Sequence, residues 1–176
     1  ALEVRVDPTS NTSPAELKAE FDYGLKLRDL QSASNDALRA LDGIREQLNT
    51  ASKTVGTFSP QASKDLLNAL KERLQQIASI EDKLVRPGNI PGYSMGPRLV
   101  DRLTALASGM ENTLTAPTGP QRELYQQLMG EFNHEIDRVN TLLTKGVPEI
   151  NDLLRKHNAG AIMSAKPIAA PAGVER

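Results

Sequence analysis

The chain has 176 residues, of which 39% are apolar and 24% are charged, and its formal net charge is −1. This length is sufficient for one domain with a hydrophobic core, and no apolar run approaches the ~20 residues of a transmembrane helix. Because aromatic residues make up only 3% and the basic residues form no stripe, nucleic acid is not an expected partner. Cysteine is absent, which excludes thiolate zinc sites and cysteine nucleophiles.

The first residues show the periodicity of a β-strand. Leu2, Val4 and Val6 alternate with charged residues, and Pro8 ends the pattern. A strand this short cannot pair with itself. We therefore expect residues 1–12 to be a strand remnant and linker from an upstream domain, and the chain to be a fragment of a larger protein.

Four stretches with apolar residues three and four positions apart follow, which is the spacing of bundle helices. Prolines open them at Pro14, Pro60, Pro97 and Pro120, a residue type favoured in the first helical turn. The seam of the first helix consists of Ala37, Leu41, Ile44, Leu48, Ala51 and Val55. The apolar face of the second helix is expected at Leu67, Leu70, Leu74, Ile77 and Leu84, with Leu66 and Ile80 beside it.

The fourth stretch is long, like the first. Its stripe consists of Leu124, Leu128, Phe132, Ile136, Val139, Leu143, Val147, Ile150 and Leu154. Pro148 lies inside this stripe and predicts a kink near Gly146, because proline lacks an amide hydrogen. Together the patterns predict an all-α, four-helix up-and-down bundle over residues 13–159, with a flexible tail over residues 160–176.

The expected topology suggests a docking surface. In an up-down-up-down bundle the first and fourth helices are antiparallel, so Leu17 and Phe21 would lie beside Ile150 and Leu154. The inner helices are shorter, and this end would leave apolar surface uncovered, which usually marks a docking site.

The loop between the inner helices would return to the same end of the bundle. It spans residues 86–96 and carries Ile90 and Tyr93. We expect it either to dock a partner through these two side chains or to be a connector that packs on the bundle.

Three segments together resemble a known family. VRVDP at residues 4–8, then LKLRD at residues 25–29, and GVPEINDLL at residues 146–154 are similar to the C-terminal helical region of large exported bacterial proteins. Those proteins are built on BNR-type β-propeller repeats and are described as sortilin-like or glycosyl-hydrolase-like. The resemblance implies that the first strand closes a β-sandwich, that any catalytic or ligand site lies on the propellers, and that the location is periplasmic or extracellular.

The residues themselves offer little chemistry. Glu131 and His134 have the spacing of half a di-iron site, but the chain lacks the second half, so we expect no metal, cofactor or catalytic residue. The sequence therefore predicts a non-catalytic structural or protein-interaction module at the C-terminus of a larger exported protein. Its partner would be the upstream domains of its own parent chain or another protein. The alternative is an extracytoplasmic bundle that senses a ligand in a pocket between its helices.

Overall fold

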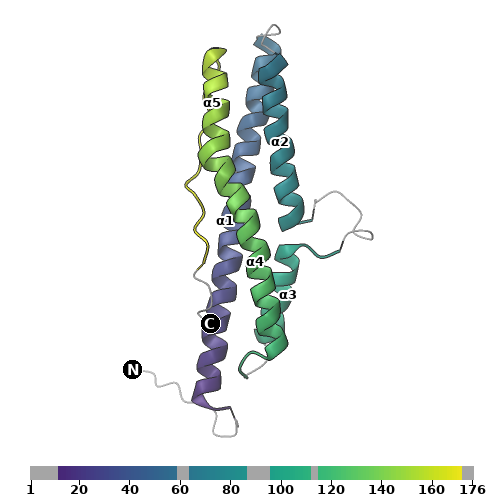
Figure 1. Ribbon diagram of the computed structural model, residues 1–176, viewed down its shortest axis with the longest axis vertical. Coiled ribbons are helices and arrows are strands. Elements are labelled where there is room, and N and C mark those ends of the chain that lie inside the picture. Colours follow the sequence, from purple (N-terminus) through teal and green to yellow (C-terminus); the bar gives the residue numbers. More distant parts are fainter. Residues whose placement is uncertain (1–11, 59–63, 87–95, 112–114, 172–176) are drawn as a thin grey trace.

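The computed structural model describes residues 12–58, 64–86, 96–111 and 115–171, and the regular structure of these residues is entirely helical (Figure 1). The elements are α1 (Pro14–Phe58), α2 (Lys64–Leu84), α3 (Leu99–Glu111), α4 (Gly119–Thr141), the π-helix η1 (Leu142–Gly146) and α5 (Val147–Lys156). The predicted all-α helical bundle is confirmed. All but one residue of the expected strand remnant and linker lie outside the described residues.

Helix α1 extends along the bundle and carries the other elements. Its 45 residues correspond to a length of about 68 Å at 1.5 Å per residue. A capping box holds its first turn, because the Ser13 hydroxyl accepts from the Glu16 amide at 3.2 Å while the Glu16 carboxylate accepts from the Ser13 amide at 2.8 Å. The predicted seam is buried, apart from Ala51, which is half-buried.

The two inner helices run in the same direction, one after the other, antiparallel to α1 (Figure 1). Ion pairs join the end of α2 to the start of α3, with Arg86 Nε 2.8 Å from Asp101 and Arg98 Nη2 2.8 Å from Asp82. The expected reversal between the second and third helices is therefore absent. The lengths of the helices give a physical reason for this arrangement. Helix α2 has 21 residues and α3 has 13, so only the two together approach the length of α1.

The last helical column, α4–η1–α5, is consequently parallel to α1. At the start of both helices the Tyr23 hydroxyl donates to the Gln121 carbonyl at 3.1 Å, and the Tyr23 and Tyr125 ring centroids are 5.1 Å apart. At the other end, Arg73 of α2 pairs with Glu149 of α5 at 2.5 Å. The order of directions is thus up, down, down and up.

Near Gly146, where the sequence predicted a kink, the structure has the π-helix η1. The amide of Val147 donates to the carbonyl of Leu142, five residues earlier. Pro148 follows directly and has no amide hydrogen, so the normal α-helical register cannot continue through it. A Cβ on Gly146 would lie 3.0 Å from Leu142 Cδ1 and 3.4 Å from Arg73 Nε, which shows how closely α2 approaches here.

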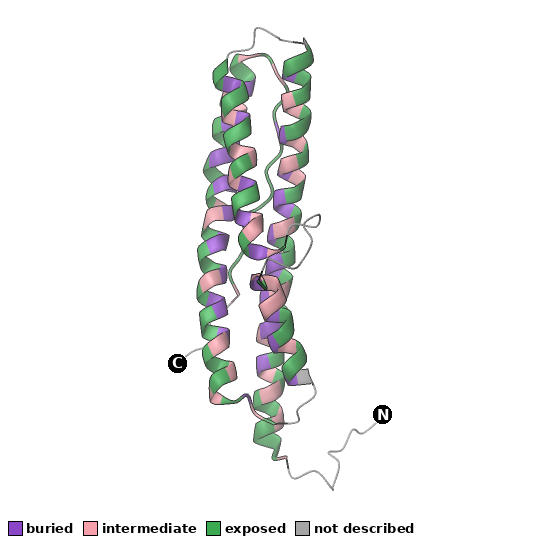
Figure 2. Ribbon diagram, turned by 90° about the vertical axis from the view of Figure 1, so that its right-hand side faces the viewer, coloured by how far each residue is buried: buried purple, intermediate pink, exposed green. Residues whose placement is uncertain are grey.

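The core follows the predicted stripes with one shift. Figure 2 shows the buried residues on the facing sides of the helices. The buried face of α2 consists of Leu66, Leu70, Ile77, Ile80 and Leu84. Leu67, which the sequence placed on that face, is 37% exposed. The true face is therefore centred one position earlier than expected at the start of α2.

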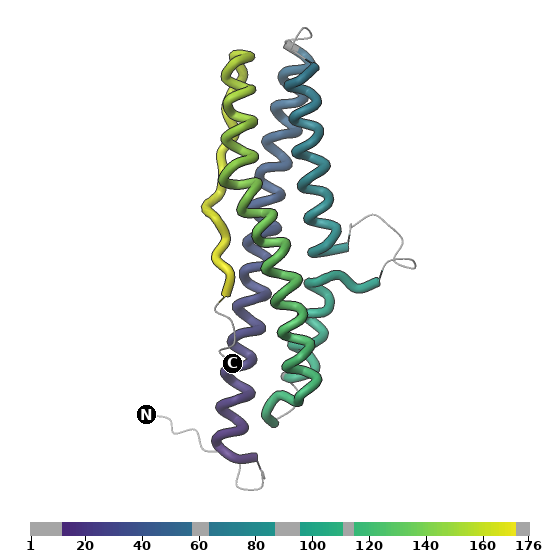
Figure 3. Tube along the Cα trace, in the orientation of Figure 1, coloured from purple at the N-terminus to yellow at the C-terminus, as the bar shows by residue number. Residues whose placement is uncertain are grey.

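The segment after α5 differs from the expected flexible tail. Asn158 ends the helix in the left-handed region (φ 54°), and the Ala159 amide returns to the Leu154 carbonyl at 2.9 Å. The chain then runs back along the bundle in an extended path as far as residue 171 (Figure 3). Side-chain hydrogen bonds from three helices hold it there, as described below. We call residues 159–171 the tail.

The two stacked tyrosines give a matched test of the contact between α1 and α4. Tyr23→Phe removes the hydrogen bond to Gln121 and should lower the free energy of unfolding by about 1 kcal/mol. The Tyr125 hydroxyl is buried and has no hydrogen-bond partner among the described residues. Tyr125→Phe should therefore leave the free energy of unfolding unchanged or raise it. Urea unfolding of the three proteins checks both expectations, and equal losses in the two variants would contradict them.

Tyr23 also makes the stability of the fold depend on pH in the alkaline range. Burial, aided by the neighbouring Tyr125 phenol, raises the pKa of Tyr23 from 10.0 to about 12. Its contribution to stability is therefore complete below pH 10 and is lost as the pH rises towards 12. Between pH 9.5 and 11.5 the wild-type chain should lose more stability than Tyr23→Phe. Parallel pH profiles of the two proteins would show that this phenol is not the cause.

Candidate functional site

The predicted docking residues do not form one surface. Leu17 and Phe21 lie near the start of α1. Ile150 and Leu154 are buried in α5, which lies at the opposite end of the bundle. The expected juxtaposition is wrong because it assumed that the first and last helices are antiparallel. Ile90 and Tyr93 lie outside the described residues, and their predicted docking role stays a prediction.

One of these residues nevertheless remains a candidate. The Phe21 side chain is 64% exposed, and Leu17, one turn earlier, is half-buried. In the described part of the chain, the other exposed large apolar residues are Leu67 and Met163. An exposed aromatic ring beside a half-buried leucine is the kind of surface that a partner can cover.

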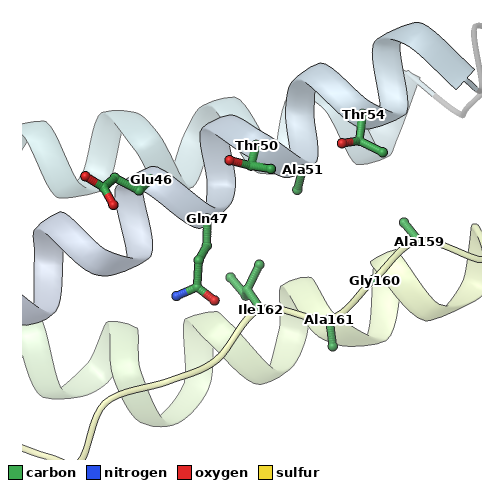
Figure 4. Close-up of a pocket in the computed structure, with 9 residues that line it drawn as sticks. All are labelled: Glu46, Gln47, Thr50, Ala51, Thr54, Ala159, Gly160, Ala161 and Ile162. Carbon is green, nitrogen blue, oxygen red and sulfur yellow. The ribbon is translucent and has the colours of Figure 1, made fainter.

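A second candidate is a groove between α1 and the tail (Figure 4). It has a volume of about 440 Å³ and lies against the last third of α1. Its lining consists of Glu46, Gln47, Thr50, Ala51, Thr54, Ala159, Gly160, Ala161 and Ile162. Figure 4 shows that the tail forms the wall opposite α1, with Ile162 pointing towards Gln47. The groove is thus formed only while the tail is in place.

Three carboxamide side chains hold the tail, and each binds both backbone groups of one tail residue. Asn151 of α5 donates to the Ile162 carbonyl at 2.9 Å and accepts from the Ile162 amide at 2.8 Å. Gln47 of α1 makes the same pair of bonds to Met163, at 3.1 and 2.7 Å. These reciprocal bonds imitate the pairing that a neighbouring β-strand would offer. We call these side chains, with Asn140 below, the carboxamide clamps.

The third clamp lies further along the tail. Asn140 of α4 donates to the Ile168 carbonyl at 2.9 Å and accepts from its amide at 2.8 Å. Between the clamps, the Ser164 hydroxyl donates to the Leu143 carbonyl in η1 at 2.9 Å. Pro148, five residues after Leu143, has no amide hydrogen to offer that carbonyl in the π-helical register. The proline that disturbs the helix therefore leaves an acceptor for the tail.

Apolar contacts add two anchors to these hydrogen bonds. Ile162 is 6% exposed and belongs to the core, and Ile168 is half-buried against it. Most other tail side chains are exposed, including Met163 at 78%. A second hollow, of about 510 Å³, lies where residues 166–171 pass Asp29 and Asp36 of α1. The tail is therefore fixed at a few points and does not fill the space along α1.

Sequence reasoning missed the clamps because their contacts leave no apolar period. Gln47, Asn140 and Asn151 each sit directly beside a seam residue, namely Leu48, Val139 and Ile150. A polar residue in that position lies on the flank of the apolar stripe rather than on the solvent face. Three uncharged carboxamides on such flanks are the signal that could have indicated an extended partner.

Glu131 and His134, which have the spacing of half a di-iron site, interact with other side chains. The Glu131 carboxylate binds Arg102 at 2.6 Å and Gln127 at 3.0 Å. His134 is largely exposed, and its Nε2 lies 3.9 Å from Glu135. Among the residues that the structure describes, no group of three or more histidine, aspartate or glutamate side chains is placed to hold a metal ion.

No family model, curated protein or solved structure matches this chain. Among the described helices, none combines the length and apolar character that crossing a membrane requires. The interpretation of both candidate surfaces therefore depends on their geometry.

Asn140 offers a direct test of how the tail is held. Asn140→Ala removes both bonds to Ile168, so the Ile168 amide should exchange with solvent deuterium about tenfold faster or more. Asn133→Ala is the matched control, because Asn133 lies in the same helix and is exposed. Hydrogen exchange followed by mass spectrometry or NMR measures both. Equal rates in the two variants would contradict the clamp.

Proposed function

We propose that this chain is a non-catalytic structural and protein-interaction module at the C-terminus of a larger exported bacterial protein. Its location would be periplasmic or extracellular, as the resemblance to BNR-repeat proteins implies. The observation that supports docking is the 64% exposure of Phe21 on a helix whose other large apolar residues are mostly buried. In this proposal the Phe21 ring, with Leu17, is the contact surface.

The proposed partner is the upstream part of the parent chain. The polypeptide enters α1 at Pro14, and Phe21 follows two turns later, about 10 Å along the helix. Residues 1–13 could span at most about 45 Å when fully extended, so a domain preceding them would lie within reach of Phe21. The short connection would also raise the local concentration of that domain and favour even a small interface.

A second function, the sensing of a small ligand, has one feature in its favour. The groove of about 440 Å³ combines the exposed polar side chains of Glu46, Thr50 and Thr54 with the apolar Ile162. A pocket of this size with few polar groups is typical of small-molecule sites. It lies between α1 and the tail rather than between helices, however, so a ligand there would alter how the tail is held.

Calorimetry with two matched variants tests the docking proposal. The chain should release or absorb heat when it is mixed with the separately expressed upstream part of its parent protein. Phe21→Ala should weaken this binding at least tenfold, because a central exposed aromatic residue commonly dominates an interface. Leu67→Ala is the matched control, because Leu67 is also an exposed apolar residue but belongs to α2. It should leave binding unchanged.

Circular dichroism and the melting temperature must be the same for wild type and Phe21→Ala, since an exposed ring contributes little to the core. No heat change at several temperatures, with both parts folded, would overturn docking through α1. Equal weakening by the two variants would show that the effect is not specific to Phe21.

A further inference from the structure

The clamps recognise the backbone of the tail rather than its side chains. Gln47, Asn140 and Asn151 make six hydrogen bonds to the tail, and all six go to the amide and carbonyl groups of residues 162, 163 and 168. Backbone groups are the same in every residue except proline, which lacks the amide hydrogen. Such a site accepts any extended segment that can place three free amides at these positions.

The two isoleucines define the side-chain requirement. Ile162 and Ile168 are six positions apart and face the bundle, whereas the residues between them are exposed. Lys166 lies beside the hollow that Asp29 and Asp36 line, but these carboxylates pair with Arg28 and Arg39 of α1, so this position sets no requirement for charge. The fitting pattern is therefore an aliphatic residue and a second aliphatic residue six positions later.

The tail fits this site incompletely. The hollow at its beginning, about 440 Å³, faces Ala159 and Gly160, and a Cβ on Gly160 would meet no atom within 4 Å. The hollow at its end, about 510 Å³, faces Ala169 and Ala170. In Figure 4 the Ala159 side chain points towards α1, so a larger side chain here would enter the first hollow. The space along α1 is larger than the segment that occupies it.

From these observations we infer that the clamps and the two hollows form a recognition site for an extended peptide segment of another protein. The chain's own tail is the segment that such a peptide displaces. This inference is independent of docking through Phe21, which lies near the other end of α1. Release of the tail would expose one buried side chain, Ile162, and could turn about the left-handed residue Asn158, which joins the tail to α5.

The test uses the full chain with its tail released. Ile162→Asp combined with Ile168→Asp should free the tail, because charged side chains cannot occupy the two apolar positions. A fluorescent peptide with the sequence of residues 157–171 is then titrated and followed by anisotropy. It should bind the released chain and bind the wild-type chain roughly 100-fold more weakly, since the attached tail competes at a high effective concentration.

Two changes in the peptide test separately how the clamps and the hollows contribute to its binding. An N-methyl group on the residue equivalent to Ile168 removes one amide hydrogen and should weaken binding about tenfold or more. Ala159→Leu should strengthen binding roughly tenfold by filling the first hollow. On the protein, Asn140→Ala should weaken binding, and Asn133→Ala should not. Equal or weaker binding of the Ala159→Leu peptide would show that the tail itself is the best-fitting ligand, which overturns displacement by a partner.

A second arrangement keeps the test valid if the double variant does not fold, as judged by circular dichroism. A protease site inserted between residues 156 and 157 allows the tail to be cut after the wild-type chain has folded. The labelled peptide should then exchange into the site. Absence of binding in the folded proteins would overturn the inference. A wild-type dimer that the peptide dissociates into monomers would assign the site to the tail of a second copy, and would equally overturn its assignment to another protein.

Discussion

The structure is organised by the length of one helix. No other helix in the described part of the chain approaches the 45 residues of α1, so the apolar seam of α1 can be covered only by segments placed one after another. Helices α2 and α3 do this in one column, and α4, η1 and α5 do it in the other. The interruption between α2 and α3 follows from this mismatch in length, whereas the irregularity at η1 follows from Pro148. The tail then takes a place beside α1 that the helices leave open.

The sequence predicted which side chains enter the core better than which helices become neighbours. Residues such as Leu41, Ile44 and Phe132 follow a helical period, and that period alone places them on a buried face. The capping box of Ser13 and Glu16 is a local pattern, because the two residues have the Ser-x-x-Glu spacing in the sequence. The direction of α3 has no such local signal, because it depends on how α3 packs against α1. Periodicity says that a face is buried but not what covers it.

The tail shows a different limit of sequence reasoning. Its main contacts use backbone amides and carbonyls, which every residue except proline carries, so neither its composition nor its spacing indicates an ordered path. The sequence predicted a flexible tail, yet its residues Pro167 and Pro171 favour the extended conformation that the clamps require. Phe21 was predicted from the sequence to be a docking residue, but Ile150 and Leu154 do not lie beside it, since that part of the prediction relied on topology.

The bond between Ser164 and Leu143 also has a mechanical consequence. It lies beside the clamps at Ile162 and Met163, and the three contacts come from different elements, so they hold this stretch of the tail from two sides. A force that lifts the C-terminal end away from the bundle would load Asn140 first and this group afterwards, as in peeling. A force along the axis of α1 would load all of them together, as in shear. The resistance of this extended segment therefore depends on the direction of pulling, although the number of bonds is the same.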